Sequence, residues 1–122
     1  MVEIAAVRRV AAALPGTEDT STAERLAFWV AGRGYAWSYL RREHPKKPRT
    51  PCLEVLAVRC PIERKELLIE ASPDLYFDDD HYRGYPAVLV RLAAIGESEL
   101  AALLADAHAW QASLPPKRQK KT

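Results

Sequence analysis

The feature that most restricts the fold of this chain is a pair of aromatic-rich runs joined by a short glycine-containing segment. Residues 27–31 and 35–40 have the composition of β-strands, and Gly32, Arg33 and Gly34 between them suit a tight turn. Since so short a connection joins antiparallel neighbours, the two runs predict a β-hairpin. We therefore expect this chain to build an antiparallel sheet.

Three aromatic residues alternate along the second of these runs. Tyr35, Trp37 and Tyr39 are spaced two apart, and side chains with that spacing project from one face of a strand. The residues between them offer a weaker apolar surface, which favours burial of the aromatic stripe against helices. If the rings were exposed instead, they could stack on unpaired bases.

Two more strands and three helices complete the predicted order. Residues 53–58 are almost continuously apolar, as in a central strand, and residues 87–92 form the last strand. Helices are expected over residues 2–14, over residues 61–71 and from Gly96 to Leu114, and proline or glycine marks where these segments begin or end.

The first and last helices each carry an apolar stripe at helical spacing. The stripes consist of Val7, Val10, Ala11 and Leu14, and of Leu100, Leu103, Leu104, Ala107 and either Gln111 or Leu114. The order α-β-β-β-α-β-α predicts an α+β fold in which the N- and C-terminal helices pack on one face of an antiparallel sheet. A single domain is expected over residues 1–115, followed by a basic, disordered tail over residues 116–122.

The composition is that of an ordinary globular protein. The chain has 122 residues, 48% of them hydrophobic, and a net charge of +2. No apolar run approaches the roughly 20 residues of a membrane-spanning helix, and the N-terminus lacks a signal-peptide pattern, so a cytoplasmic protein is expected. Cys52 and Cys60 flank a predicted strand too far apart for a disulfide, and zinc-ligand spacing is absent. No cofactor is expected.

The one marked shift in composition lies between the second run of the hairpin and the central strand. Residues 41–51 combine three prolines with five basic residues and one glutamate, which indicates an exposed loop. Lysine and arginine on such a loop could bind phosphates and release counterions. The predicted DNA-binding residues of this loop are Arg41, Arg42, Lys46, Lys47 and Arg49. The alternative is a solvated loop that keeps the chain soluble.

A second dense region is the turn before the last strand, where three aspartates at 78–80 precede His81, Tyr82 and Arg83. These last three residues could bind a protein or a small anionic ligand, and Arg83 could add an anchor for DNA. The alternative is a structural turn in which Arg83 pairs with one of the aspartates. A metal site is not expected, because consecutive residues rarely converge on one ion.

Several segments together resemble the MmcQ/YjbR family. The similarity is carried by residues 7–18, by the run from His81 to Leu92 and by the position of the last helix. The resemblance implies a YjbR/CyaY-like fold of the double-wing type, shared with frataxins, and members are commonly labelled DNA-binding. Frataxins use an acidic first helix, whereas here Glu3 stands against Arg8 and Arg9, so an iron role is not expected.

Catalysis is not expected either. The sequence contains no nucleophile elbow, no phosphate-binding glycine loop and no dinucleotide fingerprint. The resemblance supplies no catalytic residues. We therefore expect a DNA-binding protein that is a monomer or a weak oligomer, with any protein partner unidentified. The competing hypothesis is a non-catalytic module that binds its ligand at His81, Tyr82 and Arg83.

Overall fold

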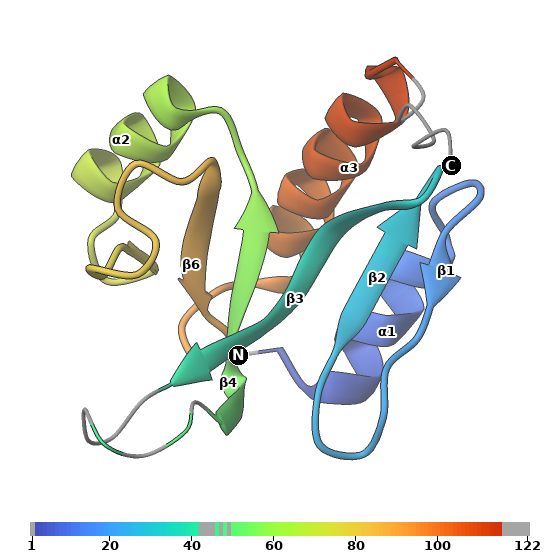
Figure 1. Ribbon diagram of the computed structural model, residues 1–122, viewed down its shortest axis with the longest axis horizontal. Coiled ribbons are helices and arrows are strands. Elements are labelled where there is room, and N and C mark those ends of the chain that lie inside the picture. The colour runs from blue at the N-terminus through green and yellow to red at the C-terminus, as the bar shows by residue number, and fades with distance from the viewer. Residues whose placement is uncertain (1, 42–45, 47, 49, 116–122) are drawn as a thin grey trace.

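The computed structural model describes residues 2–41, 46, 48 and 50–115, and these segments confirm the predicted α+β fold (Figure 1). Six antiparallel strands form one sheet in the order β1-β2-β3-β4-β6-β5. The elements in chain order are α1 (Ile4–Ala12), β1 (Glu18–Asp19), β2 (Ala27–Val30), β3 (Arg33–Arg41), β4 (Thr50–Arg59), α2 (Ile62–Ala71), β5 (Tyr76–Phe77), β6 (Ala87–Arg91) and α3 (Glu97–Ser113).

Helices α1 and α3 lie behind the sheet in Figure 1, and the main core fills the space between these two layers. The predicted stripes face this core. Val7 and Ala11 of α1 are buried, as are the α3 residues Leu100, Leu103, Leu104, Ala107 and Gln111. We call this the inner face of the sheet and the opposite one the outer face. Within the described segments, no helix is long and apolar enough to cross a membrane.

The prediction that Tyr35, Trp37 and Tyr39 share one face is wrong, because a β-bulge interrupts the alternation. Phe28 pairs with Ala36 and Trp29 pairs with Gly34, so Tyr35 is an extra residue on β3. Its ring is fully buried in the inner core. Trp37 and Tyr39 pack on the outer face instead. The bulge thus gives one aromatic residue to the main core and leaves two on the other side.

The hairpin turn lies one residue earlier than predicted. Val30 pairs with Arg33, so the two turn residues are Ala31 and Gly32, with φ angles of 51° and 76°. Positive φ at both positions is the backbone of the type I′ turn, which matches the twist of the flanking strands. As a result Gly34 lies inside β3 on the outer face, where its missing side chain leaves space.

Two short edge strands, β1 and β5, bound the sheet. The strand β5 was not predicted from the sequence. At the centre, β4 lies between β3 and β6, as the apolar run at 53–58 predicted. The loop from residue 78 to residue 86 connects β5 to β6 and covers part of the outer face.

Candidate functional site

The outer face is only partly covered, and aromatic side chains dominate what remains open. A small cluster of Ala57, Tyr82, Ala87 and Leu89 is buried there, and Trp37 and other half-buried side chains pack against it. Trp29 and Tyr85 each leave 38% of their surface exposed. These two partly exposed rings make the outer face a candidate surface for contact with a partner.

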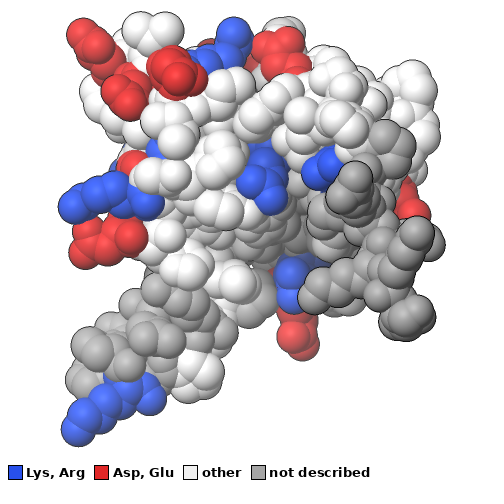
Figure 2. Space-filling view, turned by 45° about the horizontal axis from the view of Figure 1, so that its top comes forward, with Lys and Arg blue, Asp and Glu red and all other residues white. Residues whose placement is uncertain are grey.

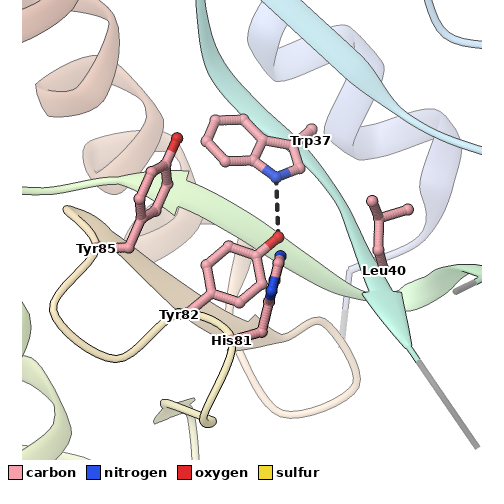
Figure 3. Close-up of a pocket in the computed structure, with 5 residues that line it drawn as sticks. All are labelled: Trp37, Leu40, His81, Tyr82 and Tyr85. Carbon is pink, nitrogen blue, oxygen red and sulfur yellow. Dashed lines mark hydrogen bonds between the residues drawn. The ribbon is translucent and has the colours of Figure 1, made fainter. Parts of the chain in front are cut away.

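Two adjoining hollows follow this face. The larger has a volume of about 330 Å³ and is lined by Arg25, Ala27, Phe28, Trp29, Gly34, Ala36, Trp37, Leu40, Arg59 and Tyr85. The smaller has a volume of about 320 Å³ and is lined by Trp37, Leu40, His81, Tyr82 and Tyr85 (Figure 3). Because they share Trp37, Leu40 and Tyr85, we treat them as one feature, the aromatic groove. Among the described residues, no aspartate or glutamate lines it.

Hydrogen bonds hold the rings of the groove in place. The indole N–H of Trp37 donates to the Tyr82 hydroxyl at 3.1 Å, a bond drawn in Figure 3. The indole N–H of Trp29 donates to Thr20 Oγ1 at 2.8 Å. The ring of Tyr85 meets that of Tyr82 edge-on, with 5.9 Å between centroids. The polar atom of each indole is thus satisfied within the protein, which leaves the ring faces as the contact surface.

Arg59 at the end of β4 lies among these rings. Its guanidinium carbon is 5.2 Å from the centroid of the Trp37 ring and 4.8 Å from that of Tyr85. Its Nε donates to the Gly34 carbonyl at 3.4 Å. Cation–π attraction therefore fixes the guanidinium in the groove and leaves its charge available to a ligand.

The described arginines differ in their partners. Carboxylates neutralise four of them, in pairs that join Arg8 to Asp19, Arg9 to Glu97, Arg64 to Asp106 and Arg83 to Asp80. In the described part of the chain, Arg25 and Arg59 in the groove form no such pair. Arg91 does not either, and it lies over the Phe77 ring on the same face, 4.1 Å from its centroid. Arg33, beside the hairpin turn, donates to a backbone carbonyl instead.

Figure 2 views the outer face obliquely and shows the resulting charge distribution. Basic side chains lie near the middle of this face, beside a hollow, whereas acidic side chains gather mainly toward the upper and left margins. A guanidinium that no carboxylate neutralises remains free to bind an anion, so the middle of the outer face is suited to an anionic partner.

The three aspartates before the last strand are all engaged within the protein. Asp78 pairs with Lys65 at 3.0 Å, and Asp80 pairs with Arg83 at 3.0 Å. Asp79 accepts hydrogen bonds from the Tyr39 hydroxyl and from the backbone N–H of Tyr82. Arg83 pairs with an aspartate, as the structural alternative for this turn expected. No group of the described histidines, cysteines and acids could hold a metal ion.

Lys65 of α2 holds this turn, and sequence reasoning missed it. Only 2% of the residue is exposed, and its Nζ donates to the Tyr82 carbonyl at 2.7 Å and to the Tyr85 carbonyl at 3.0 Å. With the Asp78 carboxylate at 3.0 Å, the ammonium has three acceptors. Lys65 lies three residues before Leu68, which packs against the core, so the two residues share a face of the helix. This spacing was the one sign in the sequence that Lys65 is buried. The bonds position Tyr82 and Tyr85, and with them one wall of the groove.

Of the three residues predicted to bind a ligand, two line a hollow and the third does not. His81 and Tyr82 line the smaller hollow, whereas Arg83 does not line it and pairs with Asp80 in the solvent. The part that Arg83 plays in binding stays a prediction.

The basic loop is only partly described. Lys46 is exposed. Arg41 ends β3, but its side chain lies outside the described atoms, and Arg42, Lys47 and Arg49 lie outside the described residues. Their predicted contacts with DNA stay predictions. Arg25, Trp29 and Arg59 were not predicted from the sequence as site residues, because only the sheet register brings them together.

Comparison with known proteins shows which family the chain resembles. The model of the YjbR family matches residues 12–110. The uncharacterized proteins Rv2570 of Mycobacterium tuberculosis and Mb2600 of Mycobacterium bovis are each 34% identical over 114 residues, covering 87% of this chain and 85% of the relative. The crystal structure of protein DR2400 of Deinococcus radiodurans aligns with a TM-score of 0.65 and 24% identity over 88% of this chain and 76% of that one, which shows the same fold.

Proposed function

The chain belongs to the YjbR family, and we propose that this member binds nucleic acid, through the outer face of its sheet and the basic loop that follows β3. We further propose that it acts in the cytoplasm, as a binding protein without a reaction of its own. The observation that carries the proposal is that the groove holds arginines that form no ion pair with a described carboxylate. Arg25 and Arg59 face a groove that has no described acidic lining, while four other described arginines are neutralised.

The position of the groove supports a joint role for the basic loop. Leu40 lines both hollows and directly precedes residues 41–49, which carry the predicted DNA-binding side chains. A nucleic-acid backbone that lies in the groove therefore runs past the start of this loop. Phosphates are the natural partners for both sets of cations, because each contact releases counterions and adds to the affinity at low salt.

A second candidate function is the binding of a small anionic ligand in the smaller hollow. The observation in its favour is that His81 and Tyr82, which the sequence singled out, do line that hollow. Its volume of about 320 Å³ is at the lower end of the range of about 300–1,000 Å³ for small-molecule sites. Arg83, the cation required by this hypothesis, does not line the hollow, so nucleic acid is the better-supported ligand.

The proposal is tested by fluorescence anisotropy with a labelled oligonucleotide over a series of salt concentrations. We expect a Kd of about 10⁻⁴–10⁻⁶ M at physiological salt, with log K falling linearly with log salt. In the double variant Arg25→Gln/Arg59→Gln the slope should decrease by about 0.7–0.9 for each phosphate that the protein no longer binds.

The matched control is the double variant Arg9→Gln/Arg64→Gln, which also removes two positive charges but from the exposed pairs Arg9–Glu97 and Arg64–Asp106. This variant should bind as the unmodified protein does. Absence of binding at low salt would refute the proposal. Equal weakening by the control and by the groove variant would show that net charge, and not the outer face, governs binding.

A further inference from the structure

We infer that the aromatic groove accepts unpaired bases, so that the protein binds single-stranded nucleic acid in preference to a duplex. This inference rests on the proposed function and narrows it to a class of ligand. It follows from four features of the groove: its floor, its walls, its fixed guanidinium and its size.

The floor of the larger hollow is bare backbone between two indoles. Trp29 and Gly34 are cross-strand partners, and a Cβ atom placed on Gly34 would lie 3.6 Å from the Trp29 ring and 3.7 Å from the Trp37 ring. Both rings therefore lie beside Gly34, each within van der Waals contact of an atom placed where its Cβ would be. A slot with aromatic walls and no side chain on its floor suits a flat group such as a nucleobase.

The walls recognise this group by stacking and not by hydrogen bonding. The indole N–H groups of Trp29 and Trp37 are already donated to Thr20 and Tyr82. The exposed ring surface is therefore apolar and held in position, and it can stack on any base because every base has a π-face. We expect binding of this kind to depend little on sequence.

Arg59 adds a planar cation beside the rings. Its guanidinium lies against Trp37 and Tyr85 and bonds to the carbonyl of Gly34, in a position to stack on a base or to bind the adjoining phosphate. Arg25 lines the same hollow and supplies a second cation for the nucleic-acid backbone. Aromatic rings and cations thus line the same hollow, and a single strand offers both bases and phosphates to them.

The size of the hollows excludes a duplex from the same mode of binding. Each has a volume of about 320–330 Å³, near the lower end of the range for small-molecule sites, so each holds about one nucleotide. In a duplex the faces of the bases are covered by their neighbours, so only phosphates and base edges are available. A duplex can therefore contact the arginines and the basic loop but not the indoles.

The test compares a short fluorescein-labelled single strand with its own duplex at one salt concentration. Trp29→Ala removes one wall, and Gly34→Val fills the floor at a position where φ is not positive and β-branched side chains suit the strand. Each variant should weaken binding of the single strand by about 5- to 150-fold, which corresponds to the range for one stacked base, and should leave duplex binding unchanged.

Trp29→Phe keeps an aromatic ring at this position and should restore most of the single-strand affinity, which a merely structural role of the indole N–H bond to Thr20 would not. Circular dichroism and thermal unfolding confirm that each variant is folded, and if Gly34→Val does not fold, the Trp29 pair decides. Equal binding of single strand and duplex, unaffected by Trp29→Ala, would overturn the inference while the proposed function stands. Failure to bind either form at low salt would overturn both.

Discussion

Replacement of Lys65 by methionine should destabilise the fold by about 2–4 kcal/mol. Methionine keeps the apolar stem of lysine but removes the ammonium and its two hydrogen bonds to the carbonyls of Tyr82 and Tyr85, which then keep only the backbone N–H groups of Tyr85 and Ala87 as donors. A hydrogen bond of this kind contributes about 1–2 kcal/mol to stability, so the two lost bonds account for the estimate. Asp78 adds little, because 29% of its side chain is exposed and water can solvate it.

Urea unfolding followed by circular dichroism measures this cost. With a denaturant slope of about 2 kcal/mol per molar for a domain of this size, the midpoint should fall by about 1–2 M. The matched control is Arg64→Met on the same helix, where the ion pair with Asp106 is exposed. This control should change the free energy of unfolding by less than about 0.5 kcal/mol.

A second substitution distinguishes the contribution of the Asp78 carboxylate from that of the two carbonyls. Adding Asp78→Asn to Lys65→Met should recover less than about 1 kcal/mol, because water reaches the partly exposed Asp78 carboxylate and most of the loss comes from the two bonds to the carbonyls. Lys65→Met should also weaken nucleic-acid binding, since Tyr85 would lose the bond that positions it at the groove. A Lys65→Met variant within about 0.5 kcal/mol of the unmodified protein would refute the role assigned to this lysine.

Three further predictions concern the turn, a thiol and a surface ion pair. Ala31→Asn should raise the free energy of unfolding by about 1 kcal/mol in urea titrations, because asparagine tolerates the positive φ of the type I′ turn better than alanine does; a loss of stability would contradict this. Burial raises the pKa of the Cys60 thiol from 9.0 to about 11, so folding favours the neutral thiol. That contribution to stability is complete below about pH 9 and is lost as the pH rises toward 11. Alkylation of Cys60 in the folded protein should stay slow at neutral pH, and rapid alkylation there would count against its burial. Arg83→Gln should change stability by less than about 0.5 kcal/mol, because both partners of the Arg83–Asp80 pair are largely in solvent, and a larger loss would show that this pair holds the turn.

Regular periodicity made much of the fold predictable from the sequence. The stripe with Val7 and Ala11 on α1 and the stripe with Leu100 and Leu104 on α3 both face the inner core, because helical spacing alone fixes which side chains share a face. The central place of β4 was also predictable, since an almost continuously apolar strand is typical of the middle of a sheet.

The groove was harder to predict, because it depends on register between strands. One extra residue, Tyr35, reverses the alternation on β3, and no local property of the sequence marks the bulge. The bulge and the earlier turn together put Gly34 opposite Trp29. Arg59 reaches the same place from the end of β4, which only the pairing of β3 with β4 reveals.

Lys65 illustrates a different difficulty. A lysine on a predicted helix is normally read as a solvent-facing residue, because a buried ammonium is costly without partners. Here two backbone carbonyls and a carboxylate supply those partners, and the carbonyls belong to a loop that begins more than ten residues later in the chain. Backbone acceptors of this kind leave no trace in the sequence.

The claim that nucleic acid binds on the outer face is tested most directly by the three indole N–H signals of the protein in a ¹⁵N-correlated NMR spectrum. Trp29 and Trp37 line the groove, whereas Trp110 lies on α3, on the other side of the sheet, and serves as an internal control. On titration with a short single strand, the signals of Trp29 and Trp37 should shift or broaden while that of Trp110 stays in place. A shift confined to Trp110, or binding that leaves all three signals unchanged, would contradict a nucleic-acid site on the outer face.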